Sequence, residues 1–346
     1  MLNVQIVLFD GFDLLDAIAP YEVFCAAAMM TGGEVRVELV TAEGARAVPS
    51  GINGLKIEAA GGRLVPSRKG IILLPGAAGE LEGDGPNAIP AILACAMGTE
   101  LSDMLGTAMQ EPDVVIATVC GGSVLLGMGG WLEGRPAVTN RLGMDFLGAM
   151  GAVPVAARVV EDGRLVMGGG VTSGLDVALY LVERELGPRI AHAIEQLFEY
   201  ERRGTVWRNS GLTPKSPTEA GDTSAEADAE PIRKLPANGD MERGKSPFDG
   251  IWDTIISTPI GKLAVKLDIA TVNGRIQGKA TMEDEVSMFI DPVASGSRLR
   301  WSQRITKPIR LNLKFDVAAT GNQMTGTAKA GVLPASALDG KRRVEV

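Results

Sequence analysis

The sequence predicts an α/β domain with a parallel sheet, followed by a small all-β, barrel-like domain. In the first part, short apolar runs rich in β-branched residues, such as 113–118, alternate with stretches of helical periodicity, a pattern typical of buried parallel strands joined by helices. Over residues 247–346, apolar and polar residues alternate with period two between turn signals, which is typical of antiparallel strands. The chain has 346 residues, 44 glycines and only 4% aromatic residues. This composition favours two domains, tight turns and an aliphatic core.

Charge and composition restrict the class of partner. The formal net charge of −8 disfavours nucleic acid or an anionic membrane as the main partner. The sequence has no run of 18 apolar residues and begins directly with a strand-like segment, so we expect neither a spanning helix nor a secretory signal. Cys25, Cys95 and Cys120 are an odd, low number of cysteines. They indicate a reduced, cytoplasmic protein without a disulfide framework.

The first domain is predicted to cover residues 1–208. Its expected strands are 4–9, 35–40, 70–74, 113–118 and 135–139, with a hairpin over 155–167; its expected helices include 14–24, 88–101, 123–128 and 177–186. The hairpin is indicated by an Asp-Gly turn at Asp162 and Gly163, a strong turn signal.

Residues 209–246 are rich in Pro, Ser, Thr, Gly and acidic residues without apolar periodicity, so we predict a flexible linker. Eight strands are expected over 247–346: 251–257, 262–269, 275–281, 286–290, 298–304, 310–317, 323–330 and 341–344. Eight short strands favour an up-and-down barrel or a two-sheet sandwich. Such a barrel can hold one small ligand, or it serves only as a scaffold or dimerisation unit.

The candidate nucleophile is Cys120, at the junction between the apolar run 113–118 and a small-residue helix. A strand that turns sharply into a helix places the junction residue at the carboxyl edge of the sheet, where ligands of open α/β sheets bind. A helix N-terminus there favours a thiolate. Gly121 and Gly122 leave room for a substrate to approach. The pattern is that of a nucleophile elbow with sulfur in place of serine oxygen. The alternative is a small apolar residue that fills the junction.

Two further segments are candidates for the same edge of the sheet. Asp16 lies just after the first strand. Its carboxylate either complements the dipole at the start of a helix or points into the same crevice as Cys120. The loop 75–79 follows another strand. One interpretation is that its backbone N–H groups, including those of Gly76 and Ala77, face an anionic intermediate; the other is that the loop is an ordinary turn between a strand and a helix. The lone histidine, His192, lies on an amphipathic helix, so we interpret it as non-catalytic. No Cys or His cluster has metal-ligand spacing, and no G-x-G-x-x-G follows the first strand.

Residues 1–205 resemble the ThiJ/PfpI superfamily, specifically its isonitrile hydratase branch. Three segments carry the resemblance: VLFDGFDLLDAIAPYEVF at 7–24, VCGGS at 119–123 with GWLEGR at 130–135, and GVTSGLD at 170–176. The resemblance implies a flavodoxin-like sandwich and a homodimer. It also implies that Cys120 is the nucleophile and Asp16 its acid–base partner, without a metal or organic cofactor. The expected reaction is hydration of a small isonitrile to an N-substituted formamide through a thioimidate adduct.

The sequence departs from that branch at two places. Gly121 stands where the branch usually has Thr, and residues 138–141 read Val-Thr-Asn-Arg in place of Thr-Thr-His-Trp. Protease-like members of the superfamily have His directly after the cysteine, and this chain does not, which disfavours peptidase chemistry. From their positions at the carboxyl edge of the sheet, we predict that a set of six residues binds substrate or an oxyanion: Gly76, Ala77, Gly121, Gly122, Asn140 and Arg141. Arg141 would suit an anionic substrate group, or it is a surface residue. The alternative functions are a glyoxalase or another cysteine-dependent hydrolase of a small electrophile, and a non-catalytic redox sensor or ligand-binding protein.

Overall fold

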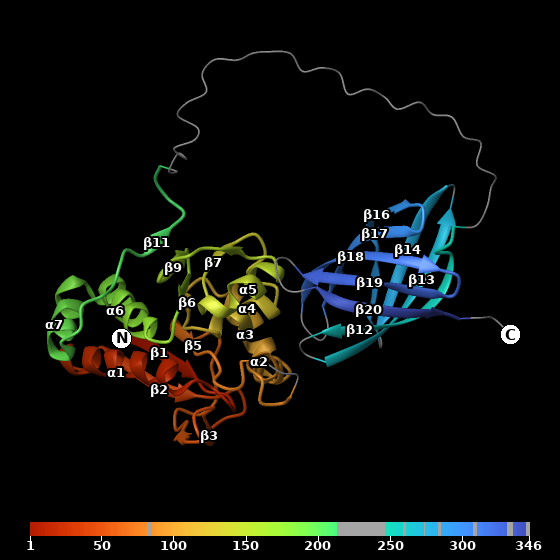
Figure 1. Cartoon of the computed structure of the whole chain (residues 1–346). Helices are drawn as coiled ribbons and strands as arrows, with labels where there is room; N and C mark the ends of the chain where they lie inside the picture. Colours follow the sequence, from red (N-terminus) through yellow and green to blue (C-terminus); the bar gives the residue numbers. More distant parts are fainter. Residues whose placement is uncertain are drawn as a thin grey trace, which may run out of the picture.

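The structure is a computed structural model that describes residues 1–81, 85–212, 246–258, 261–272, 274–282, 285–306, 310–330 and 335–343. An α/β domain occupies the N-terminal part and an antiparallel β domain the C-terminal part, as the sequence predicts (Figure 1). Most of the predicted linker, residues 213–245, lies outside the described residues, so the linker stays a prediction.

The first domain is built on a seven-stranded sheet in the order β11-β9-β10-β6-β5-β1-β2. Its strands are β1 (Leu2–Val7), β2 (Val35–Val40), β5 (Gly70–Leu74), β6 (Val114–Thr118), β9 (Val159–Asp162), β10 (Leu165–Gly168) and β11 (Trp207–Arg208). Neighbours from β2 to β10 pair in parallel, while β9 runs antiparallel to β10. Every residue of β5 is buried, as expected of a central strand covered on both faces.

Helices cover both faces of this sheet, which makes the flavodoxin-like sandwich (Figure 1). One group packs together as α1 (Leu14–Met30), α6 (Ser173–Leu186) and α7 (Pro188–Phe198); the other group is α2 (Ile89–Met97), α3 (Leu101–Gln110) and α4 (Gly122–Met128). Helix α1 begins where it does because the Asp13 side chain accepts hydrogen bonds from the N–H groups of Leu15 and Asp16, the usual role of an N-cap aspartate. No helix in the described part of the chain is long and apolar enough to cross a membrane.

The strand expected over 135–139 does not join the main sheet. Instead, β7 (Pro136–Ala137) pairs with β8 (Val153–Pro154) in a separate two-stranded sheet, and β3 (Ala47–Pro49) pairs with β4 (Lys56–Glu58) in another. Prolines in both β7 and β8 cannot donate ladder hydrogen bonds, which confines such strands to edges. The chain after β7 continues into the 3-10 turn η1 (Arg141–Gly143) and helix α5 (Met144–Ala149).

In the second domain the described residues form a nine-stranded antiparallel sheet, ordered β15-β14-β13-β12-β20-β19-β18-β17-β16. The strands are β12 (Gly250–Thr258), β13 (Gly261–Val272), β14 (Arg275–Met282), β15 (Glu285–Met288), β16 (Ile290–Ser295), β17 (Arg298–Ile305), β18 (Leu311–Thr320), β19 (Gln323–Ala330) and β20 (Ser336–Arg342). The Gln303 side chain on β17 donates to Ser287 Oγ on β15 at 2.5 Å. The two ends of the sheet therefore meet, and the barrel is nearly closed.

The ninth strand is β16, which the sequence did not indicate. Pro292 interrupts the alternating pattern there, and the register of β16 against β17 shifts between Ile290 and Val293. Proline and a register shift are tolerated because β16 is an edge strand.

Candidate active site

Three turns at the carboxyl edge of the parallel sheet converge on Cys120. The cysteine follows β6 with φ +54°, a conformation that non-glycine residues rarely adopt. Its backbone is fixed on both sides, because its N–H donates to Gly168 O at 3.1 Å and its carbonyl accepts from Thr139 Oγ1 at 2.7 Å. The strained, clamped turn has the geometry of a nucleophile elbow.

Asp16 lies beside this cysteine and is fully buried. Its Oδ2 accepts a hydrogen bond from Gly76 N–H at 2.9 Å, while Oδ1 is buried without a well-aligned partner among the described residues. Burial, followed by the nearby charge of Asp13, raises the pKa of Asp16 to about 8, although the Gly76 N–H and the Cys120 thiol act to lower it. A carboxyl group of this kind carries a proton at neutral pH, as an acid catalyst must.

The Cys120 thiol is not the activated thiolate that its position suggests. Its exposed fraction is 7%, and burial together with the Asp16 charge raises its pKa to about 12. Hydrogen bonds from Asn140 and from the Gly121 N–H favour the thiolate but are outweighed. The expectation that a helix N-terminus makes this thiol acidic is therefore wrong, because α4 has only seven residues and desolvation dominates.

Asn140 is a predicted binding residue whose side chain contacts the cysteine directly. Its Nδ2 donates to Cys120 Sγ at 3.4 Å, and its Oδ1 accepts from Leu142 N–H at 3.0 Å, which fixes the side chain. Arg141, the next residue, is exposed and does not line the cavity around Cys120. Of its two interpretations, the structure supports a surface residue, because the turn η1 directs Asn140 inward.

The four predicted backbone donors separate into two kinds. Ala77 and Gly121 line the cavity. The Gly76 N–H is used by Asp16, and the Gly122 N–H donates to Val119 O at 2.9 Å within the turn. A Cβ on Gly122 would lie 2.1 Å from Leu74 O. Gly76 and Gly122 therefore allow close packing of the turns and do not bind an anion, which corrects the expectation for these two residues.

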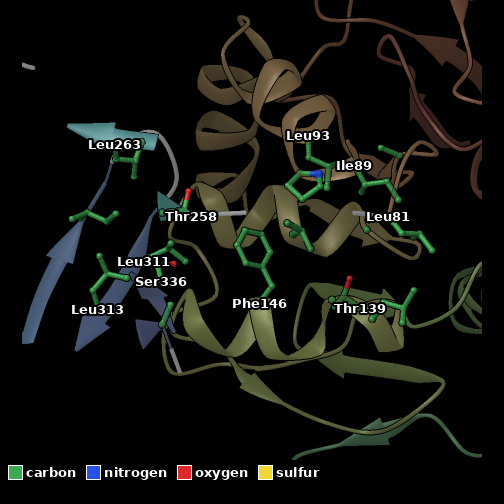
Figure 2. A pocket seen from close by; sticks show the side chains of 18 of the residues that line it. Leu81, Ile89, Leu93, Thr139, Phe146, Thr258, Leu263, Leu311, Leu313 and Ser336 are labelled. Carbon is green, nitrogen blue, oxygen red and sulfur yellow. The ribbon is translucent and has the colours of Figure 1, made fainter. Parts of the chain in front are cut away.

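A cavity of about 760 Å³ opens above Cys120. From the first domain it is lined mainly by apolar side chains, among them Ile89, Leu93, Val124, Leu142 and Phe146. Figure 2 shows Leu93 and Phe146 across from side chains of the second domain, such as Leu263 and Leu311. The volume falls in the range of small-molecule sites, and the lining favours a neutral, apolar ligand.

No group of three or more His, Cys, Asp or Glu side chains that could hold a metal ion occurs within the described ranges. His192 lies on α7 with 69% of its side chain exposed, and its Nδ1 is 3.8 Å from Glu195. That position agrees with the interpretation of a surface histidine.

Residues 3–184, more than half of the chain, match the DJ-1/PfpI family. The chain belongs to the DJ-1/PfpI family. This family includes enzymes and supports a cysteine-dependent activity, in agreement with the resemblance identified from the sequence.

Two relatives are similar in sequence to part of this chain. An 85-residue stretch is 42% identical to isonitrile hydratase from Pseudomonas putida, and it spans 25% of this chain but only 37% of that enzyme. An uncharacterized protein from the cpoL 5' region of Streptomyces lividans is 32% identical over 141 residues, which is 40% of this chain and 86% of the relative.

Solved structures also align with part of the chain. A THiJ/PfpI family protein from Pseudomonas syringae is 26% identical, with a TM-score of 0.48, over 64% of this chain and 78% of that one. DJ-1beta from Drosophila melanogaster is 20% identical, with a TM-score of 0.48, over 58% of this chain and 98% of that one.

Sequence reasoning missed two polar residues of the site and the contribution of the second domain. Asp13 lines the cavity and raises the pKa of Asp16; its position before an apolar helix was an available N-cap signal. Thr139 holds the Cys120 carbonyl, and no local pattern marks it. The cavity residues of the barrel lie on strands far along the chain, so no local pattern places them beside Cys120.

Proposed function

We propose that this protein is a cysteine-dependent hydratase that converts an isonitrile to an N-substituted formamide, with Cys120 as nucleophile and Asp16 as acid and base. The observation that carries the proposal is the buried pair of Asp16 and Cys120, with the cysteine on a strained turn. Burial raises the pKa of the carboxyl group to about 8 and that of the thiol to about 12. At neutral pH this pair holds both protons, so it supplies an acid and a nucleophile without a net charge. The partial identity to an isonitrile hydratase supports the same reaction.

The first half of the reaction forms a covalent adduct. The Asp16 carboxyl protonates the terminal carbon of the isonitrile, which becomes electrophilic, and Cys120 Sγ forms a bond to that carbon. The thiol proton passes to the Asp16 carboxylate, so the pair never has to expose a free thiolate. The product of this half is a thioimidate, in which the former isonitrile carbon is bonded to sulfur, hydrogen and nitrogen.

The second half consumes one water. Water adds its hydroxyl to the thioimidate carbon and its remaining proton to nitrogen, with Asp16 as the relay. The carbon–sulfur bond then breaks as the carbonyl forms, and the hydroxyl proton returns to sulfur. Asn140 Nδ2 and the Gly121 N–H contact the sulfur and stabilise the negative charge that develops on it as it leaves.

The cavity agrees with an isonitrile better than with the alternatives. An isonitrile is neutral and apolar except at its reacting end, as is the cavity, and Arg141 lies outside it. A redox sensor needs an accessible thiol of low pKa, whereas Cys120 is buried with a raised pKa. A glyoxalase remains the competing enzyme, and a dicarbonyl substrate in the same assay decides between the two.

The test is turnover of small isonitriles by the wild type, Asp16→Asn, Cys120→Ser and the double variant. We expect each single variant to lose about 10³-fold or more in kcat, and the double variant to lose little more, because the two groups act as a unit. Asp113→Asn and Cys95→Ser, at exposed positions, are the matched controls and should keep wild-type activity. Circular dichroism checks folding.

Near-wild-type turnover in folded Asp16→Asn would refute the mechanism. Turnover of methylglyoxal without turnover of any isonitrile would replace the proposed reaction by the glyoxalase.

A further inference from the structure

The interior of the β domain is filled at one end and hollow at the other. The filled part contains Trp252, Leu267, Leu299, Val317 and Met324, all at most 1% exposed. Three aromatic rings stack above them, with ring centroids 4.3 Å apart for Phe289 and Trp301 and 4.5 Å apart for Trp301 and Phe315. Toward the other end, side chains of the barrel line the cavity.

This hollow is continuous with the space above Cys120. One cavity is lined by Cys120, Gly121 and Asn140 from the first domain and by side chains from most strands of the barrel, including Leu263 and Ala330. Figure 2 shows Leu263, Leu311 and Leu313 on one side, facing Leu93 and Phe146 on the other. The barrel mouth therefore covers the candidate active site.

Specific contacts hold the two domains at this mouth. Glu133, in the segment before β7, forms ion pairs with Arg304 at 2.6 Å and with Arg310 at 3.1 Å. Leu311 on β18 packs against the core of the first domain. The pairs are exposed and contribute little stability by themselves, but they fix the orientation in which the hollow meets Cys120.

Polar groups inside the hollow are engaged with one another. Gln303 donates to Ser287 Oγ at 2.5 Å and accepts from Trp301 Nε1 at 3.2 Å. Glu285 accepts from the N–H and the hydroxyl of Thr306, each at 2.7 Å. Because these groups already have partners, the surface that remains for a ligand is mainly aliphatic, and burial of apolar ligand area is its main source of affinity.

We propose that the β domain is the receptor for the apolar substituent of the substrate. The substrate class is then an isonitrile with a long alkyl or aryl group, whose tail occupies the barrel while its terminal carbon lies at Cys120 Sγ. This inference rests on the proposed function for the identity of the reacting group. The apolar chamber itself does not depend on that identity.

The experiment uses the full chain and two readouts. The first is kcat/KM for n-alkyl isonitriles of increasing length, which we expect to rise about fourfold per added methylene while the tail extends into the barrel. The second is calorimetric binding of 1-alkanols from butanol to decanol, which measures the chamber without any reaction. We expect the same rise in affinity per methylene.

Ala330→Phe and Leu263→Trp fill the hollow with larger side chains, and Ala337→Phe adds the same bulk at an exposed position of β20. In the folded filled variants we expect the dependence on chain length to disappear for the long members of both series. Ala337→Phe should behave as wild type. Thermal unfolding checks that each variant is folded. Two filled positions are used so that the test still holds if one of the two variants does not fold.

Alkanol affinity that does not change with chain length, or that changes equally in the filled variants and in Ala337→Phe, would overturn the inference. Absence of isonitrile turnover with a normal alkanol series would refute the proposed function and leave the apolar chamber supported.

Discussion

At the scale of single residues, the site is governed by desolvation. Asp16 is placed in the first turn of α1, where an acidic side chain would ordinarily be an exposed charge that complements the helix dipole. Here the carboxyl is fully buried beside a thiol, so the charged form is disfavoured and the group becomes an acid. Burial also disfavours the charged form of Cys120, so the thiol keeps its proton until the sulfur forms a bond to the substrate.

The raised pKa of Asp16 predicts a pH dependence of stability. A carboxyl whose pKa is about 8 when folded and near 3.8 when unfolded contributes stability fully below the unfolded value, and this contribution is lost as pH rises to about 8. Asp16→Asn has no such loss. Its free energy of unfolding should therefore increase relative to wild type from pH 5 to pH 8, by a few kcal/mol, and then remain constant.

Urea denaturation of both proteins at pH 5, 6, 7, 8 and 9 measures this difference. Asp113→Asn, at an exposed position, is the control and should show no comparable trend. A pH-independent difference between wild type and Asp16→Asn would show that the pKa of Asp16 is not raised.

At the scale of elements, the turns after β1, β5 and β6 approach one another closely at the carboxyl edge of the sheet. Gly76 lies where these turns pack against one another. A Cβ at Gly76 would lie 2.5 Å from Gly121 N and 2.9 Å from Asp16 Oδ2. The β5 turn therefore positions both members of the candidate pair, through a hydrogen bond to Asp16 and through contact with the turn that carries Cys120.

Gly76→Ala should therefore separate these turns. We expect a loss of roughly 1–3 kcal/mol in the free energy of unfolding, as for other overpacked positions. We also expect a loss of about 10²-fold in kcat/KM, because the reacting groups move apart. Gly85→Ala is the matched control, since a Cβ there meets nothing within 4 Å. Denaturation and steady-state kinetics are the measurements, and wild-type activity in Gly76→Ala would contradict the assigned role.

At the scale of the whole molecule, the chain joins a DJ-1/PfpI domain to a nearly closed barrel whose mouth faces Cys120. The first domain has its own continuous core around the central strands, and the barrel has a separate aromatic core. Separate cores are what independent folding units require.

The homodimer stays a prediction. Light scattering of the full chain measures its molar mass in solution and tests this prediction.

Limited proteolysis tests the predicted division into residues 1–208, 209–246 and 247–346. The composition of 209–246 predicts cleavage by a broad-specificity protease within this segment. We expect two resistant fragments, identified by mass spectrometry. A full-length chain that stays protected under conditions that cleave an unstructured control would contradict two independent domains.

The sequence by itself determined most of the elements and the positions of Cys120 and Asp16, and its resemblance to the ThiJ/PfpI superfamily made these two residues the candidate pair. Apolar runs, the Cys-Gly-Gly junction and period-two alternation are local patterns. They predicted the parallel sheet, the elbow at Cys120, Asp16 after the first strand and a barrel-like tail, because local backbone preference and one-sided burial leave a direct signature in the order of residues. The prediction was wrong at two elements that contain proline. The segment that includes β7 was expected in the main sheet but pairs with β8 in a separate sheet, and β16 is a ninth barrel strand where eight were expected.

Only the tertiary structure decided the charge state of the pair and the shape of the site. The pKa of Cys120 is raised rather than lowered, Gly76 and Gly122 use their N–H groups within the turns, and Arg141 is outside the cavity. Desolvation, hydrogen-bond partners and cavity walls each depend on which distant segments meet. The barrel residues around Cys120, more than a hundred positions along the chain, are brought there by docking of two domains and leave no periodicity in the sequence.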